Sequence, residues 1–336
     1  MMKKILFASS AIAAVAFAGQ ASASEPIQLS LGGYMEQWVG FVDEDTTATS
    51  GRVNAFQSDT EVYFTGSTTL DNGIEIGARI ELEGETSGDQ VDEQFLFVNG
   101  GFGRIEVGKN DSAADAMGIT APRVGPVGPN DGGIEDWYEE AAIIDTVPSS
   151  GDQNRATYYT PSMGGFQAGV SFADDSNTAT GTYNGIDGSG DNIVSAGLAF
   201  DHDFDGVSLG LSVEGENQGE GNWYGAGVNV GFGNFTVGGS YGTKEDDYGL
   251  SNNATSTVDD TDAFDLGVSY AMDAASVSAT YAYQEQGSVE VQAASLGMAY
   301  TLGAGVSWQS SLFWFDEEST ADNDGYGLIT GLALNF

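Results

Sequence analysis

The last twelve residues of the chain, Gly325-Tyr-Gly-Leu-Ile-Thr-Gly-Leu-Ala-Leu-Asn-Phe336, decide the fold. Because successive side chains of a β-strand point to opposite faces, alternate residues of this stretch share one face. That face is mostly apolar and ends in an aromatic residue, whereas the other face carries mainly small residues, with Ile329 as the exception. The pattern predicts a strand with one face toward lipid. The apolar face is formed by Tyr326, Leu328, Thr330, Leu332, Leu334 and Phe336.

The same alternation recurs along most of the chain. Residues 207–213 and 264–270 alternate without a fault, and residues 74–82 place isoleucines on one face and Glu75, Arg79 and Glu81 on the other. Charged and small polar residues therefore line the second face of the predicted sheet. Buried against one another in a dry core, these groups would cost several kcal/mol each, which favours a water-filled interior.

The first 23 residues have the order of a secretory signal peptide. Lys3 and Lys4 precede an apolar stretch over residues 5–17, and the small residues 21–23 follow it. A transmembrane anchor is the alternative, but Ser9 and Ser10 interrupt a stretch that is already shorter than the ~20 apolar residues of a membrane span. We therefore expect a signal peptide over residues 1–23 and an exported barrel domain over residues 24–336.

Composition excludes several classes of protein. The chain has 50 acidic and 9 basic residues, a net charge of −41 and no cysteine. Such an acidic chain does not bind nucleic acid, which requires basic surface, and it has no disulfide framework. The 11% of aromatic residues and the regular alternation argue against disorder. The mature part has no apolar run of helical spanning length, so membrane insertion is expected through strands.

Short glycine-containing turns separate the strands at one end, and longer polar connections separate them at the other, as in outer-membrane barrels. We predict an all-β fold, a sixteen-stranded antiparallel transmembrane barrel, with fourteen or eighteen strands as alternatives. A change of phase near Ala293 and Ala294 predicts a β-bulge. The longer connections are expected at 43–51, 173–192, 244–262 and 316–324. The strands are expected at 27–42, 56–70, 74–85, 91–99, 104–110, 155–161, 166–173, 193–202, 207–216, 222–232, 235–243, 263–272, 275–284, 289–301, 305–315 and 325–336.

The third long connection, residues 111–154, lacks sustained alternation and is too long for an ordinary loop. We predict that it folds inward and narrows the lumen, with its acidic side chains opposite a wall that carries Arg79, Arg155, Glu81 and Arg52; Arg104 and Lys109 are further candidates. Opposed charges across a constriction set a transverse field that sieves solutes by size and dipole. The alternative is that the acids are solvated and the arginines pair with neighbours such as Glu81 or Glu106. The predicted constriction acids are Asp115, Asp131, Glu135, Asp136, Glu139, Glu140 and Asp145.

Catalytic and metal-binding signals are weak. The only histidine, His202, lies beside a predicted turn, so a hydrolase triad or an imidazole metal site has no partner histidine, and no enzyme is predicted. Acidic loops at Asp259, Asp260, Asp322 and Asp324 offer oxygen ligands for structural calcium, but none has the full spacing of a calcium loop. Solvated acidic loops without any cofactor are the favoured interpretation.

Several motifs, in this order and spacing, resemble general diffusion porins of Gram-negative bacteria, in particular the trimeric alphaproteobacterial, Rhodobacter-like porins. The resemblance covers the whole mature chain. It implies a homotrimer in outer-membrane lipid, passive diffusion of small hydrophilic solutes, and recognition of Phe336 by the barrel assembly machinery. The motifs are Gly33-Tyr-Met-Glu36, Ser58-Asp-Thr-Glu-Val-Tyr-Phe-Thr-Gly66, Leu70-Asp-Asn-Gly73, Phe102-Gly-Arg-Ile-Glu-Val-Gly108, Arg155-Ala-Thr-Tyr-Tyr-Thr-Pro161 with Gly165-Phe166, and Phe336.

This chain departs from such porins in having few basic residues for the wall opposite the acidic loop, which predicts a negative lumen and a preference for cations. The main alternative is a substrate-specific channel with a binding path of Trp38, Tyr63, Trp137 and Tyr138. A barrel enzyme or adhesin and a soluble acidic β-sandwich are less consistent with the polar inner face and the aromatic terminal strand.

Overall fold

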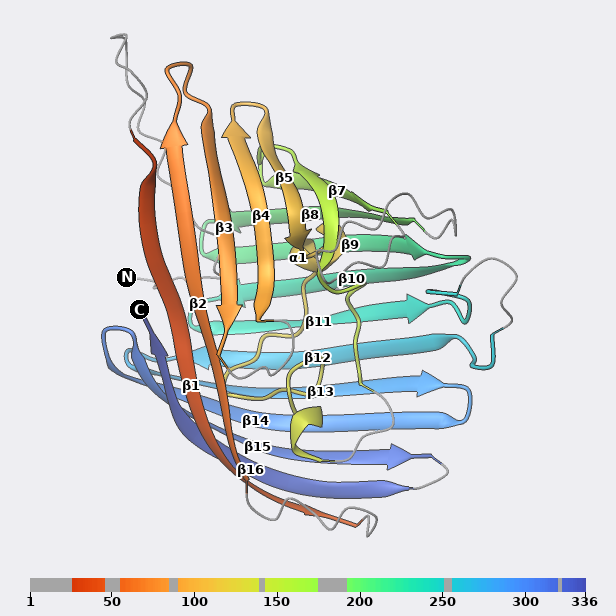
Figure 1. Cartoon of the computed structure of the whole chain (residues 1–336). Helices are drawn as coiled ribbons and strands as arrows, with labels where there is room; N and C mark the ends of the chain where they lie inside the picture. The colour runs from red at the N-terminus through yellow and green to blue at the C-terminus, as the bar shows by residue number, and fades with distance from the viewer. Residues whose placement is uncertain are drawn as a thin grey trace.

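The computed structural model describes residues 26–45, 55–84, 90–138, 143–174, 192–250, 256–319 and 322–336. Its sixteen strands form one closed barrel in which each strand pairs antiparallel with its neighbours in the chain. The barrel closes where β1 (Gln28–Glu44) pairs with β16 (Asn323–Asn335), as Figure 1 shows. The predicted fold and strand number are confirmed. The predicted signal peptide lies outside the described residues.

The other strands are β2 (Ala55–Thr69), β3 (Glu75–Glu83), β4 (Val91–Gly100), β5 (Gly103–Asn110), β6 (Gln153–Tyr159), β7 (Phe166–Ala173), β8 (Ile193–Phe204), β9 (Val207–Gln218), β10 (Gly221–Phe232), β11 (Phe235–Lys244), β12 (Thr261–Ala271), β13 (Ala275–Gln286), β14 (Val289–Gly303) and β15 (Val306–Glu318). A short helix α1 (Ala113–Met117) and a 3-10 turn η1 (Glu135–Trp137) lie between β5 and β6. No helix in the described ranges combines the length and the apolar character that a membrane span requires.

The two faces of the terminal strand separate as the alternation predicts. Tyr326 and Phe336 each expose 62% of their surface on the outside of the barrel. Ile329 and Ala333 point inward and are 0% and 1% exposed. The backbone of Phe336 completes the closure, because its N–H donates to the Gly33 carbonyl and its carbonyl accepts from the Gly33 N–H, both at 3.0 Å. The last residue is therefore fixed to the first strand.

The two ends of the barrel differ, as predicted, although less than the sequence suggested. The predicted short turns all connect hairpins at one end. At the other end, the connection between β15 and β16 is shorter than the predicted 316–324, because β15 continues to Glu318. Glu317 points into the barrel and is 4% exposed. The acidic residues 316–318 resemble a loop in the sequence, but in the barrel they extend β15.

The β-bulge predicted near Ala293 and Ala294 is wrong. The register between β13 and β14 runs unbroken there, with Ala293 opposite Ala282 and Ala294 opposite Tyr281. The irregularity in β14 instead lies at its end, between Thr301 and Gly303. Val291 and Ala293 are apolar but point inward, at 1% and 2% exposure, and this apolar inner stretch resembled a change of phase in the sequence.

The barrel encloses a dry apolar core as well as polar wall, contrary to the expectation of a uniformly wet interior. Inward side chains from β1 and from β12 to β16 pack against residues of the long connection between β5 and β6. This cluster attaches the connection to one side of the wall. Its members are Trp38, Val42, Val127, Ile134, Trp137, Tyr138, Ile144, Ala263, Ala282, Val291, Ala293, Phe313, Phe315, Ile329 and Ala333.

Candidate functional site

The connection between β5 and β6, hereafter the constriction loop (residues 111–152), folds into the barrel as predicted. Figure 1 shows it passing across the inner side of the sheet, with α1 near β7 to β9 and the 3-10 turn lower down in the view. Residues 139–142 of this loop, which include the predicted acids Glu139 and Glu140, lie outside the described residues. Ser112 caps the N-terminus of helix α1, and its Oγ accepts from the Asp115 N–H at 3.2 Å.

Hydroxyl groups on the inner wall hold the first part of the loop. The Ser171 Oγ on β7 accepts from the Ala113 N–H at 3.1 Å, and the Ser212 Oγ on β9 accepts from the Ile119 N–H at 3.0 Å. Farther along, the Ser278 Oγ on β13 accepts from the Val124 N–H at 2.9 Å. These contacts satisfy backbone groups that have no partner within the loop itself, and they fix its path along the wall.

Asp265 on β12 is the most highly connected of these wall residues. Its carboxylate accepts from the Ala121 N–H at 2.9 Å, from the Asn130 Nδ2 at 2.7 Å and from the Ser240 Oγ at 2.7 Å. The side chain is 2% exposed. One carboxylate therefore joins two separate parts of the loop to the wall.

Glycines on the inner wall give the loop room to approach. At Gly297 the Val124 carbonyl oxygen occupies the space that a Cβ would fill, and at Gly227 the Ile119 carbonyl oxygen does the same. Any larger residue at these positions would meet loop backbone, which cannot move aside as a flexible side chain does. Wall glycines and wall serines together form the surface against which the loop packs.

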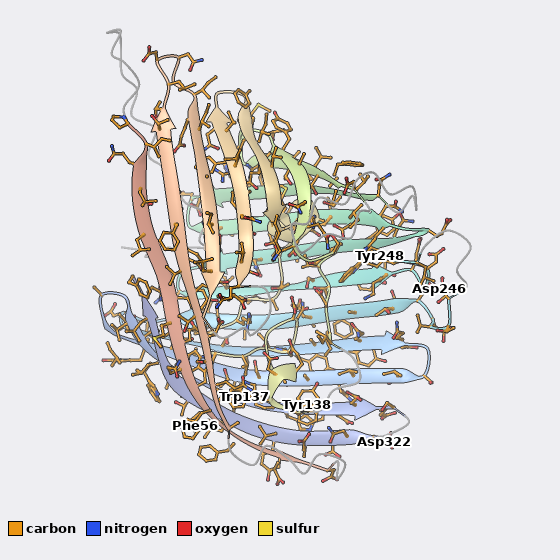
Figure 2. The ribbon with its side chains drawn as sticks, in the orientation of Figure 1. Phe56, Trp137, Tyr138, Asp246, Tyr248 and Asp322 are labelled. Atoms are coloured by element: carbon orange, nitrogen blue, oxygen red, sulfur yellow. The ribbon has the colours of Figure 1, made fainter. Side chains whose placement is uncertain are left out.

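Aromatic packing attaches the second part of the loop, which contains the labelled Trp137 and Tyr138 in Figure 2. The Tyr138 ring stacks on Phe315, and Trp137 is 1% exposed and lies over Gly40. Trp38 is 7% exposed in the same cluster. Three of the four aromatic residues of the predicted solute path therefore serve as the loop anchor, and only Tyr63 remains partly exposed.

Asp115 and Asp145 are the two most perturbed of the predicted constriction acids. Burial, with repulsion from Asp111, raises the pKa of Asp115 to about 7, although its carboxylate accepts from the Ser149 Oγ at 2.5 Å. Burial, with repulsion from Asp131 and Asp115, raises the pKa of Asp145 to about 7, against the stabilising Val147 N–H at 2.9 Å. Both groups therefore change charge near neutral pH.

The other described acids among the predicted constriction residues are Asp131, Glu135 and Asp136, which lie close together in the sequence. Burial raises the pKa of Asp131 and of Glu135, and the Glu135 Oε1 accepts from the Gly133 N–H at 3.1 Å. The backbone carbonyl of Asp136 accepts from Gln57 Nε2 of β2 at 2.8 Å, which adds a contact to the wall. Residues 131–136 thus add acidic groups to the loop, and Asp131 acts on both Asp115 and Asp145.

The predicted wall arginines Arg79 and Arg155 form an ion pair and hydrogen bonds, respectively. Arg79 forms an ion pair with Glu81 and lies 4.5 Å from the centre of the Tyr63 ring. Arg155 is 3% exposed and donates to the Ser150 Oγ at 3.2 Å and to the Gly151 carbonyl at 2.5 Å, so it holds the end of the loop. Arg52 lies outside the described residues.

One feature of the site was missed by the sequence prediction. Arg123 lies within the loop, and its side chain is exposed inside the barrel; its position as a basic residue among the loop acids was visible in the sequence. Arg104 forms an ion pair with Glu106, as the alternative interpretation had it. The inner surface is therefore a mixture of neutralised pairs and unpaired charges.

The four aspartates proposed for calcium are not brought into a shared site. Among the described residues, carboxylate groups within 4.8 Å of one another occur at two other places, Glu61 with Glu83 and Asp92, and Glu93 with Asp111 and Asp152. Instead, Asp260 Oδ1 accepts from the Asp246 N–H at 2.9 Å, and Asp322 Oδ1 accepts from the Ser319 N–H at 3.2 Å. Figure 2 labels Asp246 and Asp322 at the end of the barrel with the long connections.

His202, at the short-turn end of β8, is exposed on the outside and lies between aromatic rings, 5.9 Å from the centre of Phe200 and 4.4 Å from that of Phe204. The His202 side chain points away from the lumen, because inward and outward residues alternate along β8 and His202 belongs to the outward set. This placement offers no catalytic arrangement for the only histidine of the chain.

Comparisons with known proteins agree with this architecture. Outer membrane porin protein 32 of Delftia acidovorans is 27% identical over 227 residues, which is 63% of this chain and 60% of that protein. A porin of Rhodobacter capsulatus is 29% identical over 119 residues, 35% of this chain and 38% of that porin. The matches therefore span less than two thirds of the length of either relative.

Among solved structures, an anion-selective porin from Comamonas acidovorans has a TM-score of 0.66 at 16% identity and covers 92% of this chain and 100% of its own. A variant of the Rh. blastica porin has a TM-score of 0.65 at 18% identity, with the same coverage. At these identities the likeness concerns the fold. A family model described as Gram-negative porin matches residues 8–319, and this protein therefore belongs to the Gram-negative porin family.

Proposed function

We propose that this protein forms a water-filled outer-membrane channel for passive diffusion of small hydrophilic solutes and ions. The observation that carries the proposal is the sixteen-stranded closed barrel with an internal loop fixed against its wall. A barrel of this size leaves an aqueous lumen, and a loop inside it narrows the passage. The loop contacts the wall on β7, β9, β12, β13, β15, β1 and β2, so the passage lies between the loop and the remaining part of the wall.

The outer face of the barrel supports placement in a membrane. Apolar side chains point outward along the strands, and aromatic rings gather near the short turns, among them Phe204, Phe235 and Trp308. Girdles of aromatic residues at the membrane interface are typical of outer-membrane barrels. Export by a cleaved signal peptide over residues 1–23, and recognition of the exposed Phe336 by the assembly machinery, complete this proposal.

The charge of the lumen supports a preference for cations. Most of the described basic residues on the inner wall are paired or buried, whereas carboxylates recur on many strands and on the loop. A passage lined with excess negative charge concentrates cations and repels anions. Among the inward, buried acids of the wall, Glu81 and Glu106 pair with arginines, and the others are Glu61, Glu214, Glu216, Asp265 and Glu317.

The outside of β1 and β2 supports association with further copies of the chain, which we propose to form a homotrimer. Gln37 and Ser58 are outward-facing and lie directly opposite each other across the two strands. Polar side chains facing lipid are unfavourable, and contact with another protein surface relieves that cost. A trimer in which β1 and β2 contact a neighbouring copy would cover this polar patch.

Planar-bilayer recording of the purified protein tests the proposal. We expect stepwise increases of current with an ohmic, non-saturating dependence on salt, in triplets of equal conductance for a trimer. A protein that inserts without any conductance would contradict the channel, and single steps of one unit would contradict the trimer. Saturation by one solute would instead indicate a substrate-specific channel.

A further inference from the structure

Of the basic residues that the structure describes, Arg123 alone has an exposed side chain. Arg79 and Arg104 form ion pairs with neighbouring glutamates. The three remaining described basic residues are also engaged, since Lys109 and Arg155 are buried and Lys244 lies 4.5 Å from the centre of the Trp223 ring. A paired charge acts on distant ions as a dipole, whose effect decreases more steeply with distance than that of a single charge.

Local contacts hold the Arg123 side chain in place. Its Cδ lies 2.6 Å from the position that a Cβ would take at Gly128, so the absence of a side chain at Gly128 makes room for the arginine stem. Its Nη1 donates to the Gly132 carbonyl at 3.2 Å, which fixes one edge of the guanidinium. The remaining donors of the guanidinium are available to water or solutes in the lumen.

The backbone on both sides of Arg123 is attached to the wall. The Ala121 N–H donates to Asp265 at 2.9 Å, and the Val124 N–H donates to Ser278 at 2.9 Å. The guanidinium therefore occupies a fixed position on the loop. A charge on a fixed support acts on passing ions without first having to be ordered.

Acidic groups surround Arg123 without neutralising it in a close pair. Asp131 and Glu135 of the loop and Glu36 of β1 are the charges that act on it, and it forms no ion pair with any described residue. Glu36 belongs to the wall, so at this level a positive charge on the loop, beside the loop acids Asp131 and Glu135, faces a negative charge on β1. This polarity is the reverse of the predicted acidic loop opposite a basic wall.

We propose that Arg123 is a selectivity-determining residue of the channel and the group that meets the anionic part of permeating solutes, such as a carboxylate or chloride. The inference rests on the proposed channel function. The otherwise acidic passage repels anions, and one unpaired guanidinium lowers that repulsion locally by offering donors and positive charge. Arg123 thereby limits the cation preference and lets small anionic solutes pass.

Reversal potentials under a potassium chloride gradient test this role. We expect Arg123→Gln to increase the cation-to-anion permeability ratio about threefold, as removal of one nearby unit charge should, whereas Arg123→Lys stays close to the wild-type ratio. Lys244→Gln removes the same charge from a position against Trp223 and serves as the matched control, with a change less than half as large. An equal change in Lys244→Gln and Arg123→Gln would overturn the proposal.

The chain contains no cysteine, so Arg123→Cys provides a second test on channels already inserted in the bilayer. We expect a cationic thiol reagent added to the bath to return the permeability ratio toward that of the wild type, and an anionic reagent to raise it further. A thiol that does not react from the water, or reacts without altering the ratio, would overturn the role of Arg123. Failure of the wild-type protein to conduct would contradict the channel function instead.

Discussion

The Tyr138 ring stacks on Phe315 with ring centroids 3.7 Å apart and 13° between the ring planes. This contact joins the constriction loop to β15 in the interior of the barrel. Because aromatic rings gain stability when they are removed from water and stacked, the pair anchors the loop at a site where hydrogen bonds alone would compete with channel water.

Removal of this anchor is expected to release the loop. Phe315 is 0% exposed, and Phe315→Ala should lower the free energy of unfolding by about 3–5 kcal/mol, as for other buried aromatic residues. Single-channel recordings should show larger and noisier currents. Phe232→Ala, on the outer face with 54% exposure, is the control and should leave the currents unchanged. Quiet, wild-type currents in Phe315→Ala would show that the stack does not hold the loop.

The close approach of the loop to β14 gives a second prediction. Gly297→Ala would place a Cβ against the Val124 carbonyl oxygen, so we expect the loop to shift and stability to fall by about 1–3 kcal/mol. Gly303→Ala on the same strand is the matched control, because nothing lies within 4 Å of its Cβ position. Thermal unfolding in detergent and single-channel conductance measure both effects. Equal stability and equal conductance of the two variants would show that the loop does not lie against Gly297.

Asp265 should be important for the loop because four donors from three residues converge on it, the Ser240 N–H among them. Asp265→Ala leaves the Ala121 N–H, Asn130 and Ser240 without their acceptor, at about 1–3 kcal/mol for each donor that stays buried. Asp265→Asn keeps one acceptor oxygen and should lose less. The conductance of Asp265→Ala is expected to drift as the loop moves. A loss as large in Asp265→Asn as in Asp265→Ala would point to the charge rather than to the hydrogen bonds.

Selectivity is expected to depend on pH near neutrality. The pKa values of Asp115 and Asp145 are raised by burial from 3.8 to about 7, so both carboxyls are protonated below about pH 6 and ionised above about pH 8. The cation-to-anion permeability ratio should therefore rise with pH across this interval. Asp145→Asn should reduce the rise, whereas a ratio that is constant from pH 5 to pH 8 would place these acids away from the ion path.

The same pKa shifts have a consequence for stability, with a defined sign. Because the folded protein holds these protons more tightly than an unfolded chain does, the free energy of unfolding should fall as pH increases from about 4 to about 7. Thermal unfolding at a series of pH values measures this slope. Asp145→Asn should flatten it.

Much of this fold was predictable because the two faces of a strand leave a local pattern in the sequence. The alternation in residues 264–270 and 325–336 predicted both strands and their orientation, and the loss of alternation after Asp111 predicted the inward loop. The contacts made by inward residues were not predictable in this way. Val291 and Phe315 point inward like their polar neighbours, and only the position of the loop makes that part of the interior dry.

The ion pairs of the site were likewise not predictable from the sequence pattern. Arg79 pairs with Glu81, and this pairing depends on side-chain geometry that spacing alone left open. Arg123 was overlooked because the loop was interpreted through its many acids. A single basic residue among acids does not have to form an ion pair. Here the hydrogen bond to the Gly132 carbonyl holds the Arg123 side chain within the lumen.

The reversal potential of the wild-type protein in a planar bilayer, under a potassium chloride gradient at neutral pH, measures the charge selectivity of the passage. An acidic passage, moderated by a single exposed arginine among the described residues, predicts a conducting channel whose reversal potential has the sign of potassium selectivity. A conducting channel with the sign of chloride selectivity would contradict this account.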